Sequence, residues 1–200
     1  MDRTAPTDRP ILDLLARRWS PRAFSDRPVD TATLATLFEA ARWAPSSFNE
    51  QPWRFIVATR DDAVAYERVL GCLVAFNQEW ARTAPVLLIT VAALRFARNG
   101  KDNAHARHDI GLAMMALTVQ AQAMEISVHQ MAGIDPAKAR ADLGIADGFE
   151  PVTAAAIGYQ GDPALLNPKL RDQEIAPRER RALDQSVFAG RFAEPAPWAR

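Results

Sequence analysis

The chain is poor in cysteine and histidine, and these scarcities exclude some kinds of function. Its one cysteine, Cys72, cannot form an intramolecular disulfide and fits a reducing compartment, so we expect a cytoplasmic protein. Cys72 stands among apolar neighbours, which favours a small core residue over a nucleophile. His105 and His108 lie close to acidic residues, but so small a supply of histidine and cysteine predicts no metal site.

The chain also lacks a surplus of either charge and any long apolar run. Lys plus Arg equals Asp plus Glu at 24 each, so no overall field favours nucleic acid or an anionic membrane. No run of about 18 apolar residues exists to span a bilayer, and the first residues form no apolar signal core. What is present is ordinary globular composition, 48% hydrophobic and 24% charged, over 200 residues, a length that suits one domain.

Hydrophobic periodicity predicts alternating helices and short buried strands. Asp30 can cap a helix over 31–43, a second helical stretch follows over 61–76, and the longest apolar stripe predicts a central helix over 103–128. Three apolar runs are predicted as strands: 55–58, 86–91 and 152–157. The middle run is apolar throughout, which is typical of a strand covered on both faces. The pattern indicates a layered α+β domain.

A basic stretch near the N-terminus is the first polar feature of interest. Arg18, Ser20 and Arg22 alternate around Pro21, which biases Ser20 towards extended backbone, so the three side chains should face one side. Two guanidinium groups and a hydroxyl on one face favour an oxyanion clamp, because arginine presents a forked set of donors. A solvated basic surface is the alternative.

A second polar stretch, Ala-Pro-Ser-Ser-Phe-Asn-Glu-Gln-Pro-Trp over 44–53, separates a predicted helix from a predicted strand. Ser46, Ser47 and Asn49 supply many small donors and acceptors between two buried elements, which suits a polar planar ligand. An ordinary turn is the alternative, since Pro, Ser and Asn are common turn residues.

Together these two stretches resemble the FMN-dependent nitroreductase family, through Arg-x-Ser-x-Arg followed by Ala-Pro-Ser-Ser-x-Asn-x-Gln-Pro-Trp. The similarity continues in family order through 76–80, 131–135, 150–159 and 177–181, so that it spans about 12–188. The resemblance implies an α+β nitroreductase-like fold, with a central mixed, mostly antiparallel sheet flanked by helices. It also implies a single domain over 1–200 with short tails, and an intertwined homodimer with FMN at the interface.

The resemblance implies a role for each polar segment. Arg18 and Ser20 would bind the phosphate and ribityl side of FMN, and Arg22 would lie near the N1/O2 edge of the flavin and tune it. Arg178 and Arg180 would bind the phosphate, with Arg181 as the alternative to Arg180. The other implied contacts are Ser46, Ser47 and Asn49 from the other subunit, Asn77 on the pyrimidine ring, and Gln130, Met131 and Gly133 near N5.

The chain departs from the family pattern at two places that bear on this site. Some members carry a lysine three residues after the asparagine matched by Asn77, where this chain has Trp80. Many have Gly-Leu where this chain has Glu125 and Ile126, which could alter the local chain path. His129 lies beside the loop of Gln130, Met131 and Gly133 that is implied to pass near N5. A structural histidine is expected there rather than a proton donor.

The activity implied by the resemblance is electron transfer from NADH or NADPH, through bound FMN, to nitroaromatics, quinones or similar conjugated electrophiles by a ping-pong mechanism. No protein side chain is implied as catalytic, because the flavin carries the chemistry. The alternatives are a flavin-binding, storage or sensor protein with little turnover, and a specialised relative such as a reductive dehalogenase or a flavin-fragmenting enzyme.

Overall fold

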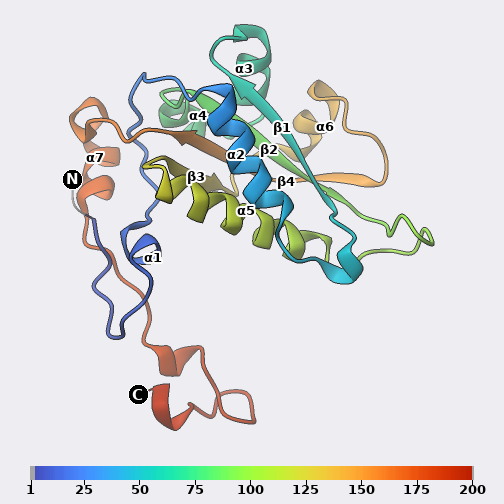
Figure 1. The fold of residues 1–200 in the computed structure, drawn as a ribbon. Coiled ribbons are helices and arrows are strands. Elements are labelled where there is room, and N and C mark those ends of the chain that lie inside the picture. Colours follow the sequence, from blue (N-terminus) through green and yellow to red (C-terminus); the bar gives the residue numbers. More distant parts are fainter. Residues whose placement is uncertain (1–2, 200) are drawn as a thin grey trace.

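Four antiparallel strands form the central sheet of the computed structural model, which describes residues 3–199 (Figure 1). The strands are β1 (Trp53–Thr59), β2 (Val86–Ala93), β3 (Ser127–Met131) and β4 (Phe149–Gly158), in the order β1-β2-β4-β3. All three predicted strands are confirmed, and so is the α+β class. The sheet was predicted to be mixed and mostly antiparallel, and every strand pair among the described residues is antiparallel.

Helices cover both faces of this sheet (Figure 1). They are α1 (Asp13–Arg17), α2 (Thr31–Arg42), α3 (Ala63–Leu70), α4 (Ala75–Ala81), α5 (Ala106–Ala123), α6 (Pro136–Asp142) and α7 (Pro168–Ile175). Single 3-10 turns are η1 (Ser47–Asn49), η2 (Pro163–Leu165), η3 (Leu183–Gln185) and η4 (Pro197–Ala199). Within residues 3–199, no helix combines the length and apolar character needed to cross a membrane.

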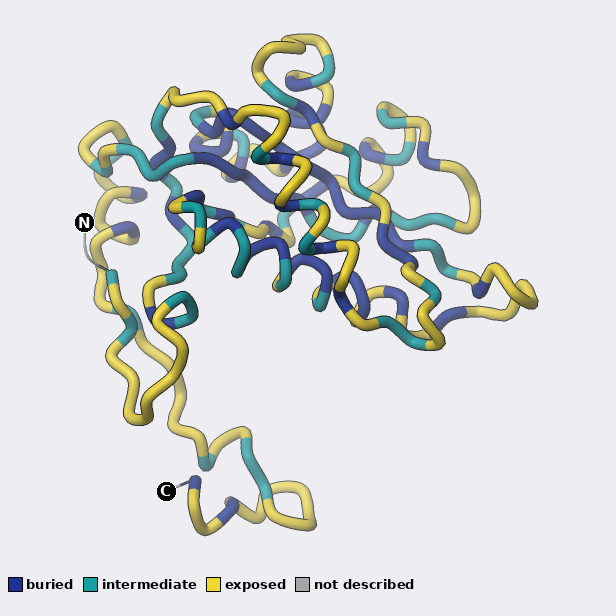
Figure 2. The backbone as a smooth tube through the Cα atoms, viewed as in Figure 1, coloured by how far each residue is buried: buried dark blue, intermediate teal, exposed yellow. Residues whose placement is uncertain are grey.

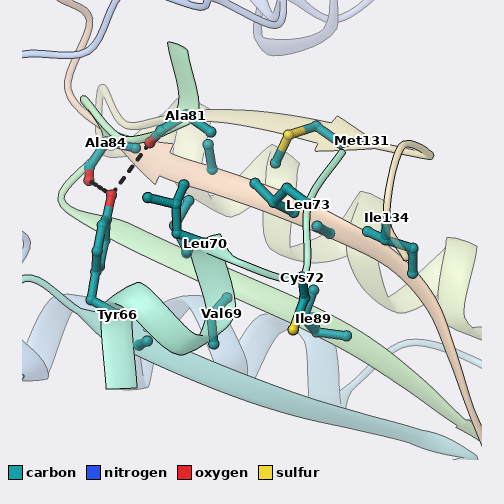
Figure 3. Packing of buried hydrophobic residues seen from close by; sticks show 14 of the residues in the cluster. Tyr66, Val69, Leu70, Cys72, Leu73, Ala81, Ala84, Ile89, Met131 and Ile134 are labelled. Carbon is teal, nitrogen blue, oxygen red and sulfur yellow. Dashed lines mark hydrogen bonds between the residues drawn. The ribbon is translucent and has the colours of Figure 1, made fainter. Parts of the chain in front are cut away.

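Two hydrophobic clusters lie on opposite faces of β2, as its continuous apolar run predicts. Leu87 and Ile89 face the cluster built with α3, α4 and α6, whereas Leu88 faces the cluster built with α2 and α5. Figure 3 shows part of the first cluster, in which the Tyr66 hydroxyl donates to the Ala84 carbonyl at 2.6 Å. Cys72 is fully buried in this cluster, where burial raises the pKa of its thiol, so its predicted core role is confirmed.

The first predicted helix is confirmed at its start, since the Asp30 carboxylate accepts the Thr33 amide at 2.7 Å. The second predicted helix, over 61–76, is wrong in extent because the chain forms two helices, α3 and α4, with a break between them. At the break, the Cys72 carbonyl accepts the Asp135 amide, and the Val74 amide donates to the Gly133 carbonyl. These tertiary hydrogen bonds replace the helical ones that local periodicity predicts.

The predicted central helix is confirmed as α5, but it ends at Ala123 rather than near Val128, which belongs to β3. The end is set by Glu125, whose φ of 59° is the left-handed conformation that usually falls to glycine. The next amide, Ile126, then donates to the Ala121 carbonyl at 2.8 Å and closes the helix. The chain therefore turns into β3 through a left-handed backbone conformation, even though glutamate occupies the position.

Residues 176–199 form a C-terminal segment, which follows α7 and extends away from the helix and sheet layers (Figures 1 and 2). Most of its residues are exposed, including Phe192 at 90% and Trp198 at 69%. The segment folds locally, with Phe188 and Phe192 in an edge-to-face contact and Ala196 donating its amide to the Val187 carbonyl.

Candidate functional site

Arginines from three parts of the chain gather beside α1. The pKa of Arg18 is lowered by burial first and then by the charge of Arg180. The pKa of Arg178 is lowered by burial and by the charges of Arg18, Arg180 and Arg3. Among the ion pairs described for residues 3–199, none gives Arg18, Arg178 or Arg180 a carboxylate partner. Crowded cations without counter-ions suit a bound anion.

Arg178 also holds the cluster together. Its guanidinium donates to the carbonyls of Arg3, Ala16 and Arg18, the latter two at 2.8 Å. These bonds use three of the five N–H groups of its guanidinium. Arg18 in turn donates to the Ser20 hydroxyl at 3.3 Å, so the first two residues of the basic motif are joined. The charge of Arg180 lowers the pKa of both Arg18 and Arg178.

Arg22 lies against a buried carboxylate that the sequence analysis did not single out. Glu174 of α7 is 1% exposed, and its two oxygens accept the Arg22 amide at 2.8 and 3.0 Å. Glu174 also accepts the Ala23 amide at 3.1 Å, and the Arg22 guanidinium lies 4.0 Å away. The Arg22 Nε atom is buried with no described hydrogen-bond partner. The spacing from buried Leu170, four residues earlier, was the available signal that this glutamate faces inward.

His129 ties the basic motif to β3. Its ring Nδ1 lies 2.9 Å from the Pro21 carbonyl, and a carbonyl can only accept, so Nδ1 carries the proton and donates. Burial, opposed by this hydrogen bond, lowers the pKa of His129 to about 4. The ring packs on Trp80 with centroids 4.4 Å apart. The neutral, packed imidazole fits the expected structural role, and Trp80 lies in the core.

Asn77 and Gly133 meet at the end of β3. The Asn77 side-chain amide donates to the Gly133 carbonyl at 3.0 Å. A Cβ added to Gly133 would lie 2.5 Å from Asn77 Nδ2, so this approach requires glycine. Met131 points into the core, leaving its backbone for a ligand, whereas Gln130 is exposed on an edge strand. Edge strands carry unpaired N–H and C=O groups, which suit the polar rim of a planar ring.

The turn over 46–51 is strained in a way common at binding sites. Phe48, Asn49 and Gln51 have φ values of 53°, 56° and 52°, in the left-handed region. The Ser46 hydroxyl accepts the Gln51 amide at 3.0 Å and closes the turn. The buried carboxylate of Asp109, a second residue that the sequence analysis missed, accepts the Ser47 amide at 3.1 Å and fixes the turn to α5.

The candidate site has two halves, the basic motif with its arginine cluster and the turn over 46–51. They lie at opposite ends of α5 (Figure 1). The Ser47 turn contacts Asp109 in the first turn of the helix. The basic motif contacts His129 in β3, which follows the other end of the helix. At 1.5 Å per residue, 18 helical residues span about 27 Å, beyond the reach of any side chain. The chain therefore places the basic motif beside β3 and Asn77 at the end of β3, whereas the turn with Ser46, Ser47 and Asn49 lies at the other end of α5.

The antiparallel sheet between two helical layers is the nitroreductase fold. The chain belongs to the nitroreductase family, whose model matches residues 15–73 and 66–159.

Solved and curated relatives agree with this placement. A structure described as an oxidoreductase containing FMN is 34% identical, with 95% of this chain and 96% of that chain covered and a TM-score of 0.89. A variant of an FMN and NADPH-dependent nitroreductase from a Sphingopyxis strain is 27% identical, with coverage of 90% and 98% and a TM-score of 0.65. An uncharacterised 15.4 kDa protein of Mycolicibacterium smegmatis is 32% identical over 151 residues, which are 71% of this chain and 99% of that protein.

Proposed function

We propose that the chain, acting as one domain over residues 1–200, is an FMN-dependent oxidoreductase. In this proposal it passes electrons from NADH or NADPH to nitroaromatics, quinones or similar conjugated electrophiles. Bound FMN supplies hydride and electron transfer, for which it needs no protein nucleophile. The observation that carries the proposal is the arginine cluster: Arg178 donates to the Arg18 carbonyl, burial and neighbouring arginines lower the pKa of Arg18 and of Arg178, and neither has a carboxylate partner among the described ion pairs.

In this proposal the residues of the chain would contact FMN in order from its phosphate to its flavin ring. Arg18, Arg180 and the remaining donors of Arg178 would hold the terminal phosphate, which carries more charge in FMN than the bridging phosphates of FAD. Asn77 and the exposed backbone of β3 would meet the polar rim of the flavin, and Arg22 would approach its N1/O2 edge. His129 would not exchange protons with the ring near neutral pH, because its pKa lies at about 4.

We further propose that two copies of the chain complete each site. Ser46, Ser47 and Asn49 stand at the far end of α5 from the arginines, so a second copy would have to supply them. The C-terminal segment extends from its own domain with aromatic side chains exposed, which suits wrapping around a partner chain. A homodimer is the simplest assembly that meets both conditions.

The test is a visible absorption spectrum of the purified protein, followed by anaerobic titration with NADH and with NADPH. We expect a yellow protein with one FMN per chain, bleached rapidly by at least one of the two nucleotides. A colourless protein that binds no added FMN would overturn the proposal. Bound FMN that neither nucleotide bleaches would instead indicate a flavin-binding protein with little turnover.

A further inference from the structure

The buried carboxylate of Glu174 has no role in the function proposed above, yet it contacts the basic motif more closely than any other acidic residue described there. It accepts two consecutive backbone amides, those of Arg22 and Ala23, and it lies 4.0 Å from the Arg22 guanidinium. Both residues are more than 150 positions away in the sequence, so only the fold brings the groups together.

Because Glu174 is buried, its hydrogen bonds hold the backbone of Arg22 and Ala23 in place. A carboxylate that is 1% exposed is costly unless its oxygens accept hydrogen bonds, and here the acceptors are met by backbone donors of the basic motif. Moving the Arg22 backbone away would leave the charge without partners. Glu174 therefore holds the loop over 20–23 at a defined distance from α7. It thereby also fixes the direction in which the side chains of Ser20 and Arg22 point.

The same carboxylate affects the electrostatics of Arg22. The Arg22 side chain is 23% exposed and its only described ion pair is with Glu174, so much of its charge is compensated from one side. The 4.0 Å separation is long for a charge-assisted hydrogen bond, and the Arg22 Nε atom has no described partner. The guanidinium thus lies near Glu174 without a described hydrogen bond to its carboxylate.

We propose that Glu174 is a positioning residue that anchors the Arg22 loop through its backbone and offsets the positive field that Arg22 applies to the flavin. The inference rests on the proposed function for its second half only. Anchoring is a property of the protein without FMN, whereas the field is read from the redox potential of the bound flavin.

The anchoring half is tested on FMN-free protein by amide hydrogen exchange in wild type, Glu174→Gln and Asp172→Asn. Asp172 is an exposed acid of the same helix and serves as the matched control for loss of a negative charge. In Glu174→Gln, exchange at Arg22 and Ala23 should accelerate about tenfold, equivalent to one lost hydrogen bond. In Asp172→Asn it should not change. If the folded Glu174→Gln protein exchanges both amides at the same rates as wild type, the anchoring role is overturned.

The electrostatic half is tested by spectroelectrochemistry of the FMN-loaded proteins. Glu174→Gln should favour binding of the anionic reduced flavin over the oxidised flavin by about tenfold more than wild type, which raises a two-electron midpoint potential by about 30 mV. Asp172→Asn should leave the potential unchanged. A potential that is unchanged or lower in Glu174→Gln would overturn the proposed offset.

A second variant keeps the test decisive if Glu174→Gln does not fold. The double variant Arg22→Gln/Glu174→Gln removes both charges together. The midpoint potential of its bound FMN should therefore lie closer to wild type than that of Arg22→Gln alone. Equal potentials in the single and double variants would overturn the offset. If wild type binds no FMN, the proposed function fails and the electrostatic half fails with it, while hydrogen exchange still decides the anchoring half.

Discussion

Few of the arginine charges at the candidate site are compensated by a nearby carboxylate. Arg18, Arg178 and Arg180 repel one another, whereas Arg22 faces Glu174. Sequence patterns indicated the arginines, since a run of alternating basic residues is visible locally. They did not indicate Glu174, because an acidic residue on a short polar helix is usually solvated.

Arg22→Ala should lower the midpoint potential of bound FMN and slow its reduction by NAD(P)H. The substitution removes the cation expected near N1/O2 and leaves the Glu174 carboxylate without its ion pair, so the anionic reduced flavin is disfavoured. Loss of one charge-assisted contact costs about 1–3 kcal/mol, and this corresponds to a drop of roughly 20–65 mV for a two-electron couple. Spectroelectrochemistry measures it, and an unchanged potential with FMN fully bound would show that Arg22 does not face N1.

His129 should make the folded protein sensitive to mild acid. Its pKa is about 4 when folded and 6.5 in the unfolded chain, so between these values the unfolded state binds the proton and the folded state does not. Stability due to this group is therefore present above about pH 6.5 and falls as the pH is lowered towards 4. Between about pH 7.5 and 5 the loss should be about 2 kcal/mol.

The measurement is urea unfolding across this pH range in wild type, His129→Asn and His105→Asn. Asparagine at position 129 keeps an N–H for the Pro21 carbonyl but does not titrate, so its pH dependence should be shallower by the stated amount. His105 is exposed, and its substitution should leave the slope as in wild type. Identical slopes in all three proteins would contradict the buried, neutral assignment.

Elements follow local patterns where nothing else competes for their backbone groups. The Asp30 cap and the apolar stripe of α2 are local signals, and the helix matches the prediction. The break between α3 and α4 is not a local signal, since it depends on hydrogen bonds to 133–135. The Ser47 turn likewise depends on Asp109, which lies 62 positions later.

Glu125→Gly should stabilise the protein by about 0.5–1 kcal/mol. The residue ends α5 with a φ of 59°, a conformation that costs a non-glycine residue about 1–2 kcal/mol. The extra entropy of glycine in the unfolded chain takes back part of the gain. Urea unfolding of wild type, Glu125→Gly and Glu125→Ala measures it, and alanine should give no gain because it keeps the left-handed strain. Destabilisation by glycine would mean that the Glu125 side chain contributes contacts of its own.

At the scale of the whole molecule, the distance between the candidate halves has a direct experimental consequence. If each FMN uses Arg18 from one chain and Ser47 with Asn49 from another, variants defective in different halves should complement each other. Arg18→Ala and Ser47→Ala/Asn49→Gly proteins should each bind FMN poorly. After unfolding and refolding together in equal amounts, about a quarter of the sites should be intact, because half of the dimers are mixed and each holds one complete site.

FMN titration of the refolded mixture, followed by fluorescence of the free flavin, measures this complementation. The control is the same mixture combined without unfolding, in which exchange of chains is limited. Binding no better than that of the separate variants would contradict the shared site and would place each FMN within one chain.

The fold class, three of the strands, the central helix and the arginine motifs can be predicted from the sequence, because each depends on local spacing of apolar or basic residues. The left-handed turn at the end of α5 forms at a glutamate, and the hydrogen bonds that follow it are local. Only the tertiary structure shows that Glu174 contacts the basic motif, that Asp109 contacts the Ser47 turn, that His129 is buried and neutral, and that the two halves lie at opposite ends of α5. The physical reason is that burial and charge compensation depend on groups distant in sequence, which a local pattern does not contain.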